Sequence, residues 1–238
     1  MKKIDLFFDE NYLEYGIRKY VSLDFERSPH LLIYGGTGSG KTVASKLILA
    51  RIAKIFPDSQ IYIASYKGDS KDFGALEGAK RYYRFWECKQ ALDEFRAMLD
   101  RRMSGEETSR TFQLMLFDEW ASYLANCDKR TAEEEKQKLG TILMMGRSYN
   151  LHIIISEQRC DSTHYSAGGR DQFGTIIALG SLSSEGKEMM FREFKDKMKP
   201  RTRGTGYIRD DINITPIRVP TIRDMKKIDE YIKDAVNR

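Results

Sequence analysis

Eight residues in the first fifth of the chain, GGTGSGKT at 35–42, have the types and spacing that bind phosphate groups. They fit the pattern G-x-x-x-x-G-K-[ST] at all four of its fixed positions. Glycines let backbone N–H groups converge on phosphate oxygens, and the N-terminus of a following helix adds partial positive charge. We expect Lys41 to reach the β- and γ-phosphates and Thr42 to bind Mg²⁺. The predicted nucleotide-binding residues are Gly35, Gly36, Thr37, Gly38, Ser39, Gly40, Lys41, Thr42 and Val43.

Two adjacent carboxylates follow the apolar run LMLF at 114–117. Asp118 ends an expected strand and is placed to hold Mg²⁺, directly or through water. Glu119 suits a general base that orients or deprotonates the attacking water. A kinase needs no such second carboxylate, because its nucleophile arrives on a substrate. The pair could instead cap the next helix, but beside the phosphate loop it indicates hydrolysis, with ATP and Mg²⁺ as the cofactors.

A third polar cluster ends the apolar segment Leu151 to Ile155, which is followed by Ser-Glu-Gln-Arg at 156–159. In ATPases that carry a Glu after the magnesium Asp, one strand lies between the phosphate-loop strand and the Asp strand. The tip of that strand points at the γ-phosphate. Gln158 is therefore predicted to detect the phosphate and to take part in catalysis. The alternative is that Gln158 hydrogen-bonds the loop that follows it.

The elements that must position these residues alternate between strands and helices. The apolar patterns predict strands at 30–34, 60–65, 112–117, 151–156 and 174–180, and helices at 41–55, 87–103, 129–149 and 184–198. GTGYI and ITPIRV indicate a hairpin or paired edge strands. We predict an α/β, RecA-like P-loop NTPase fold of the additional-strand, catalytic-Glu type, with a mostly parallel central sheet flanked by helices. The expected divisions are a short β-rich segment at 1–27, the ATPase domain at 28–222 and a C-terminal helix at 223–238.

Composition limits the remaining classes. The 238 residues are 41% hydrophobic and 32% charged, and the net charge of +5 permits nucleic-acid binding without arguing strongly for it. The three Cys and three His form no zinc pattern. No stretch approaches the roughly 18 apolar residues of a membrane span, and the first residues do not form a signal peptide. We expect a cytoplasmic protein that reaches a membrane only through a partner.

Four segments resemble one family. SPHLLIYGGTGSGKT resembles the P-loop of FtsK-type DNA translocases, and LFDEWASYL resembles their magnesium strand. GRSYNLHIIISEQR is similar to their segment in which Gly-Arg precedes a strand ending in Thr-Gln-Arg, and RGTGYIRDDINITPIRV resembles their closing hairpin. The resemblance covers roughly residues 20–222 and implies an FtsK–HerA superfamily motor domain. The absence of membrane segments, a long linker and a winged-helix module, and the change of Thr-Gln-Arg-Pro to Glu157–Cys160, favour a plasmid, integrative element or phage over chromosome segregation.

The resemblance also implies a homo-oligomer, a hexameric ring with double-stranded DNA in its channel and nucleotide between subunits. In such rings an Arg from the neighbouring subunit contacts the γ-phosphate. Arg147, just ahead of the strand at 151–156, is the first candidate and Arg170 the second, although either could be a surface charge. Loops at 66–74 and 159–172 would line the channel. Its DNA-contact candidates are Lys67, Lys71, Arg159 and Arg170, each of which could instead be an ordinary loop charge.

Three functions follow from these patterns. The first is an ATP-driven motor that translocates double-stranded DNA during replication or transfer of a mobile element, with a relaxase or a replication initiator as a possible partner. The second is a viral genome-packaging ATPase of the same superfamily. The third is a nucleotide-gated assembly protein that moves no DNA.

Overall fold

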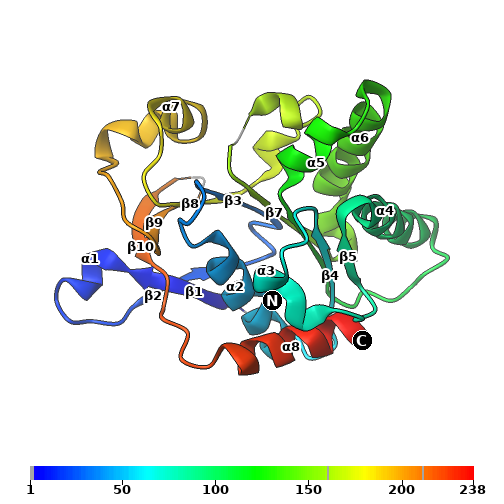
Figure 1. Ribbon diagram of the computed structural model, residues 1–238, viewed down its shortest axis with the longest axis horizontal. Helices are drawn as coiled ribbons and strands as arrows, with labels where there is room; N and C mark the ends of the chain where they lie inside the picture. Colours follow the sequence, from blue (N-terminus) through cyan, green and yellow to red (C-terminus); the bar gives the residue numbers. More distant parts are fainter. Residues whose placement is uncertain (1–2, 160, 211) are drawn as a thin grey trace.

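The computed structural model describes residues 3–159, 161–210 and 212–238 (Figure 1). Its strands form a single ten-stranded sheet. They are β1 (Ile4–Asp9), β2 (Tyr20–Leu23), β3 (His30–Tyr34), β4 (Gln60–Ser65), β5 (Tyr82–Arg84), β6 (Gln113–Asp118), β7 (Leu151–Glu157), β8 (Thr175–Leu179), β9 (Thr205–Arg209) and β10 (Ile214–Arg218).

The sheet order is β2-β1-β10-β9-β8-β3-β7-β6-β4-β5. From β8 to β5 every neighbouring pair is parallel, while β9, β10, β1 and β2 continue the other side as antiparallel strands. β7 lies between the phosphate-loop strand β3 and the Asp118 strand β6, as predicted. The predicted α/β fold with a mostly parallel sheet and flanking helices is confirmed.

Helices cover both faces of this sheet (Figure 1). They are α1 (Glu10–Leu13), α2 (Lys41–Ile55), α3 (Ser70–Phe73), α4 (Cys88–Ser104), α5 (Trp120–Asn126), α6 (Lys129–Met145), α7 (Ser184–Phe191) and α8 (Met225–Asn237). Side chains that alternate along the strands separate two cores. Leu32 and Tyr34 of β3 pack with α4, α5 and α6, whereas Leu31 and Ile33 pack with α2 and α8.

Several predicted elements match the structure closely, and two helix ends were predicted wrongly. α2 and β4 have the predicted bounds. The helix predicted at 129–149 ends at Met145 and continues as the 3-10 turn η3 (Gly146–Tyr149), where a Cβ on Gly146 would lie 2.6 Å from the Leu151 carbonyl oxygen. The helix predicted at 184–198 ends at Phe191 and continues as the 3-10 turn η6 (Arg192–Lys197). β5, α3 and α5 were not predicted, because they are too short to show a period.

Both terminal segments pack with the central sheet. β1 pairs with β10, so the N-terminal strands extend the same sheet. α8 buries Ile232, Ala235 and Val236 in the core that also contains the buried face of α2. An ion pair of 2.8 Å between Lys46 Nζ on α2 and Asp229 Oδ1 on α8 joins the two helices. The helix that follows the phosphate loop is therefore held from two sides.

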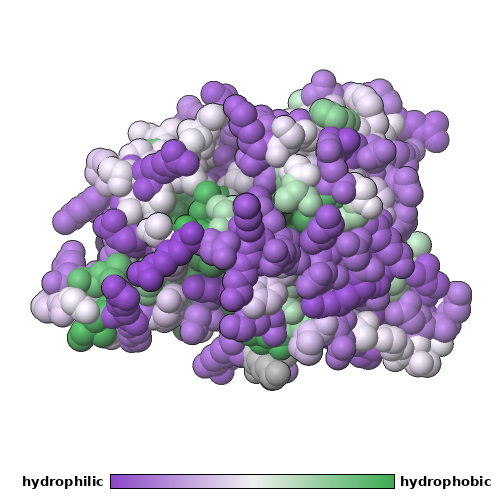
Figure 2. Space-filling view, turned by 60° about the horizontal axis from the view of Figure 1, so that its bottom comes forward, coloured by the Kyte–Doolittle hydropathy of each residue, from purple (hydrophilic) through white to green (hydrophobic). Residues whose placement is uncertain are grey.

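The surface is largely hydrophilic. Figure 2 shows hydrophobic residues only in small patches on the face it presents, one of them at the left edge where α1 and the β1–β2 connection lie. Ile17 in this connection is 54% exposed. Within residues 3–159, 161–210 and 212–238, every helix is too short or too polar to cross a bilayer.

Candidate functional site

The site is assembled at the carboxyl ends of three neighbouring parallel strands, where α/β proteins place their ligands. The registers pair Tyr34 with Glu157 and Asp118 with Ser156. The residues that follow these strands must therefore meet at one edge of the sheet. That edge brings the phosphate loop, Gln158 and Glu119 together.

The phosphate loop has a backbone shape that only glycines adopt without strain. Gly38 and Gly40 have φ angles of +76° and +104°. A Cβ on Gly35 would lie 2.5 Å from the Leu179 carbonyl oxygen, so this glycine is needed for close packing on β8. An added Cβ on Gly36 or Gly38 would meet no atom within 4 Å. The backbone there is open to a ligand, as a phosphate cradle requires.

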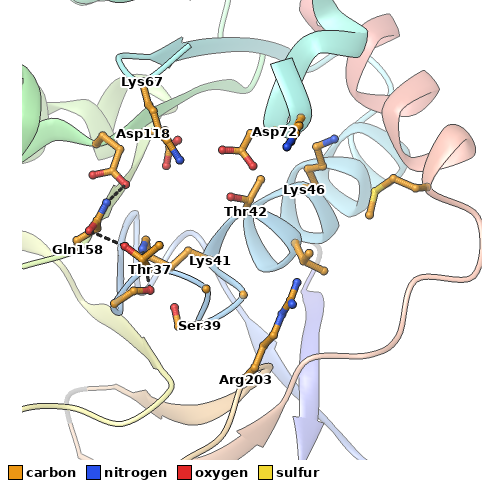
Figure 3. Close-up of a pocket in the computed structure, with 17 residues that line it drawn as sticks. Thr37, Ser39, Lys41, Thr42, Lys46, Lys67, Asp72, Asp118, Gln158 and Arg203 are labelled. Carbon is orange, nitrogen blue, oxygen red and sulfur yellow. Dashed lines mark hydrogen bonds between the residues drawn. The ribbon is translucent and has the colours of Figure 1, made fainter. Parts of the chain in front are cut away.

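Lys41 begins α2 and points back into the loop (Figure 3). Its side chain is buried, and Nζ donates to the carbonyl oxygens of Gly35 at 2.5 Å and Gly36 at 3.4 Å. Burial lowers the pKa of Lys41 from its ordinary value. An ammonium group held this way lies where anionic oxygens in the loop would reach it.

The two carboxylates are buried next to the loop. Burial raises the pKa of Asp118 to about 6. A divalent cation beside this carboxylate would offset the cost of burying its charge, and Thr42 lines the same pocket. The residues therefore fit Mg²⁺. Glu119 has a φ of +65°, which is strained for a residue with a side chain, and its N–H donates to the Ser156 carbonyl oxygen at 2.7 Å.

Gln158 connects the loop to the second carboxylate. Its Nε2 donates to Glu119 Oε1 at 2.9 Å, and its Oε1 accepts a hydrogen bond from Thr37 Oγ1 at 3.0 Å (Figure 3). The alternative, in which Gln158 only supports the loop after it, does not describe these contacts. The amide instead spans the space between the phosphate loop and Glu119.

The pocket has a volume of about 340 Å³ and contains several residues to which the sequence assigned no role or another role. Lys67 and Lys71, predicted as DNA contacts, lie on its wall together with the phosphate loop and are available to phosphates there. Lys46, Asp72, Arg203 and Met225 also line it, and no role was predicted for any of them. Of these four, only Lys46 could have been placed at the pocket from the sequence, because it lies one helical turn after Thr42 and so faces the same side of the helix.

Three predicted arginines lie outside this pocket. Arg147 is exposed in η3, ahead of the amino end of β7, and lines a separate depression with Arg110 and His152. It is thus at the opposite edge of the sheet from its own phosphate loop. Arg159 is exposed, and Arg170 is half-buried in the 3-10 turn η5 (Arg170–Gln172). Cys160, within the loop at 159–172, lies outside the described residues.

No protein-family model matches the chain. A protein named FtsK domain-containing protein YdcQ from Bacillus subtilis (strain 168) is 26% identical over 224 residues, which cover 87% of this chain and 46% of the relative. The chain thus spans about half the length of the curated relative that it matches.

Two solved structures have the same fold. The cytoplasmic domain of the Thermomonospora curvata type VII secretion ATPase EccC superposes with a TM-score of 0.71 at 16% identity, over 99% of this chain and 31% of that chain. The pCW3 conjugation coupling protein TcpA, in its monomer form with ATPγS, gives a TM-score of 0.73 at 21% identity, over 90% of this chain and 67% of that chain.

The curated relative is named for its FtsK domain, and the structural neighbours have the same arrangement of sheet and helices. The phosphate loop, the paired carboxylates and the bridging Gln158 lie together where these segments were expected to meet. The chain is thus similar over most of its length to an FtsK domain-containing protein, and it has the fold of the P-loop ATPases among its structural neighbours.

Proposed function

We propose that the chain is a motor domain that hydrolyses ATP and uses the energy to translocate double-stranded DNA. The observation that carries the proposal is the hydrogen-bonded path from Thr37 through Gln158 to Glu119. It links a loop that can bind phosphate to a carboxylate that can activate water. Gln158, in the middle of this path, directly precedes the loop at 159–172, which we propose contacts DNA.

In this mechanism each residue has a separate task. The loop N–H groups and Lys41 bind the β- and γ-phosphates and stabilise the charge that develops on them. When bound, Mg²⁺ would reduce the charge on the phosphates, with Thr42 and Asp118 as its protein ligands. Glu119 accepts a proton from the attacking water, and Gln158 holds Glu119 in position for it.

An intact site would need a second subunit. Arg147 lies at the edge of the sheet opposite its own phosphate loop, so it could reach a γ-phosphate only in a neighbouring copy. We infer a ring, with six subunits as in the family it resembles, in which Arg147 completes the neighbour's site. Arg170 is the second candidate for this role.

The cellular role we propose is DNA movement during replication or transfer of a mobile element, with a relaxase or replication initiator as the DNA partner. The likeness to a conjugation coupling protein supports this role. The likeness to a secretion ATPase favours a second candidate, a nucleotide-gated machine that moves no DNA. Viral genome packaging, the other alternative, is supported by a likeness in fold to a genome-packaging NTPase, with a TM-score of 0.56.

The experiment that separates them is steady-state ATP hydrolysis without DNA, with single-stranded DNA and with double-stranded DNA. A DNA motor should be stimulated severalfold by duplex DNA, and Lys41→Ala should abolish hydrolysis under every condition. Hydrolysis that is abolished by Lys41→Ala but unaffected by either form of DNA would favour the machine that moves no DNA.

A further inference from the structure

A second hollow continues from the phosphate pocket on the far side of the first turn of α2. Its volume is about 420 Å³, within the range of small-ligand sites. The two hollows share Gly40, Val43, Arg203 and Met225 as a common wall. The second is also lined by the β10–α8 connection, at Val219, Pro220, Thr221 and Ile222. A ligand bound by its phosphates in the first hollow would extend into the second.

Backbone hydrogen bonds join the segments that line the two hollows. Gly204 N–H donates to the Ser39 carbonyl oxygen at 2.9 Å, and Val219 N–H donates to the Gly204 carbonyl oxygen at 2.8 Å. The phosphate loop, the segment before β9 and the β10–α8 connection therefore form one wall. The position of the second hollow relative to the phosphate loop is fixed by these bonds, so it suits the nucleoside part of the same ligand.

The chemistry of the second hollow is unusual for a site that reads a base. No Asp, Glu, Asn or Gln is among its described lining residues. Arg218 is engaged by Glu10, with Nη2 to Oε1 at 3.0 Å. The Gly204 carbonyl oxygen already accepts from Val219, and Pro220 has no N–H to donate. The Thr221 hydroxyl can both donate and accept, so it suits an amino or a carbonyl substituent equally.

Arg203 is the lining residue whose side chain could stack on a base. It is exposed, and Figure 3 shows it rising from the segment before β9 toward the first turn of α2, on the side away from Thr42. Within the described part of the chain it makes no ion pair with a carboxylate. A guanidinium plane stacks on aromatic rings whatever their hydrogen-bonding edge. Val43, Ile222 and Met225 supply apolar contacts that likewise do not depend on the hydrogen-bonding edge of the base.

We propose that this second hollow binds the nucleobase by stacking on Arg203 and by apolar contact, without reading the base edge, so that the chain hydrolyses purine nucleoside triphosphates rather than ATP alone. This inference rests on the proposed nucleotide hydrolysis. A site built to hydrogen-bond a substrate rejects an analogue by about 10⁴-fold or more, whereas contact surfaces discriminate by roughly 10²-fold or less. The second hollow is a contact surface of this kind, so it should discriminate only weakly between bases.

The first test compares kcat/KM for ATP and GTP on the wild-type protein. The two values should lie within about 100-fold of each other. A larger preference for either purine would overturn the proposal. If the folded protein hydrolysed neither nucleotide, the proposed function itself would fail, and inorganic triphosphate binding would show whether the phosphate site still operates.

The second test separates base stacking from phosphate binding. Arg203→Ala should raise KM for ATP and for GTP by about threefold to thirtyfold, in line with the loss of one cation–π contact, and should leave kcat unchanged. The affinity for inorganic triphosphate, which has no base, should not change. Arg130→Ala, at a side chain that is 89% exposed, is the matched control and should alter nothing. An equal loss of triphosphate and ATP affinity in Arg203→Ala would make Arg203 a phosphate ligand and overturn its stacking role.

Discussion

Gln158 and Glu119, 39 residues apart in the chain, share a hydrogen bond of 2.9 Å between Nε2 and Oε1. The other end of the same amide accepts from Thr37 Oγ1 at 3.0 Å. Because an amide has fixed donor and acceptor ends, a shift of Thr37 would move the carboxylate that we propose as the base. The state of the phosphate loop and the position of the base are thus connected through one side chain.

This connection predicts two different effects at position 158. Gln158→Ala should lower kcat by about tenfold to hundredfold, as expected when a reacting group loses its alignment, while ATP affinity stays close to wild type. Gln158→Glu should lower kcat further than Gln158→Ala, because a second carboxylate repels that of Glu119 and cannot donate the hydrogen bond to its Oε1. Single-turnover kinetics would measure both. Unchanged kcat in Gln158→Ala would show that Glu119 is positioned by other contacts.

The second prediction separates phosphate binding from water activation. Lys41→Ala should abolish hydrolysis and weaken ATP binding, because the ammonium group that faces the phosphates is lost. Glu119→Gln should bind ATP normally and hydrolyse it at least about 10²-fold more slowly, because an amide cannot accept the proton. Nucleotide binding by calorimetry and turnover would be measured in parallel. Near-normal turnover in Glu119→Gln would remove Glu119 from the role of base.

The third prediction tests the shared site. Arg147→Ala should lose hydrolysis but keep its fold and its nucleotide affinity, since Arg147 is exposed and distant from its own loop. Mixing Arg147→Ala with Glu119→Gln protein should restore part of the activity. Some interfaces then combine an intact Glu119 with an intact Arg147. Mixtures that stay inactive, together with normal folding by circular dichroism, would point to Arg170 or to no trans residue.

The fourth prediction concerns DNA. Arg159→Ala should weaken duplex binding equally for all sequences and reduce the slope of log K against log salt by about 0.9, the value for one lost phosphate contact. ATP turnover without DNA should not change, whereas its stimulation by DNA should fall. Arg130→Ala, another exposed arginine, serves as the control. A loss restricted to one DNA sequence would indicate a base-reading loop instead.

The fifth prediction concerns acid stability and depends on His30 at the start of β3. His30 is fully buried, and its Nδ1 accepts a hydrogen bond from the Ile153 N–H at 3.1 Å. Burial lowers the pKa of His30 from 6.5 to about 3. Below pH 6.5 the unfolded chain binds a proton that the folded chain excludes, so this contribution to stability is present above pH 6.5 and is lost as the pH falls toward 3.

The variant His30→Asn keeps an acceptor for the Ile153 N–H but does not titrate. The difference in unfolding free energy between wild type and His30→Asn should therefore change by about 1.4 kcal/mol per pH unit below pH 6.5, in favour of the variant. Urea denaturation at several pH values would measure it. His152, whose pKa burial lowers to about 4, should still destabilise both proteins in acid. Parallel curves for the two proteins would show that His30 does not carry the effect.

Much of the fold could be predicted because local patterns and tertiary structure agree. The helix at 41–55 carries apolar residues at helical spacing and has a proline soon after it, and it forms with those bounds. The strand at 151–156 is apolar enough to require burial on both faces, and it lies in the middle of the sheet. The shape of the phosphate loop could be predicted from its glycines, because residues with a side chain adopt the φ angles of Gly38 and Gly40 only with strain.

The remaining parts depend on contacts between distant segments. Lys67 and Lys71 follow a strand end, and only the pairing of β4 with β6 turns their loop toward the phosphate pocket. Arg203 reaches that pocket because Gly204 binds the Ser39 carbonyl oxygen, a contact that no local pattern encodes. The end of α6 was misplaced because the close approach of Gly146 to the Leu151 carbonyl oxygen is a tertiary constraint.

The left-handed backbone of Glu119 bears on how this protein can be engineered. A non-glycine residue held at such a φ costs on the order of 1 kcal/mol, and here the side chain is also a buried carboxylate. Glycine at this position would remove both costs along with the proposed base. Selection for heat resistance alone would therefore enrich Glu119→Gly and other inactive clones, as happens wherever stability and activity make opposite demands on one residue. A library aimed at a more robust motor should keep position 119 constant and score turnover alongside thermal tolerance.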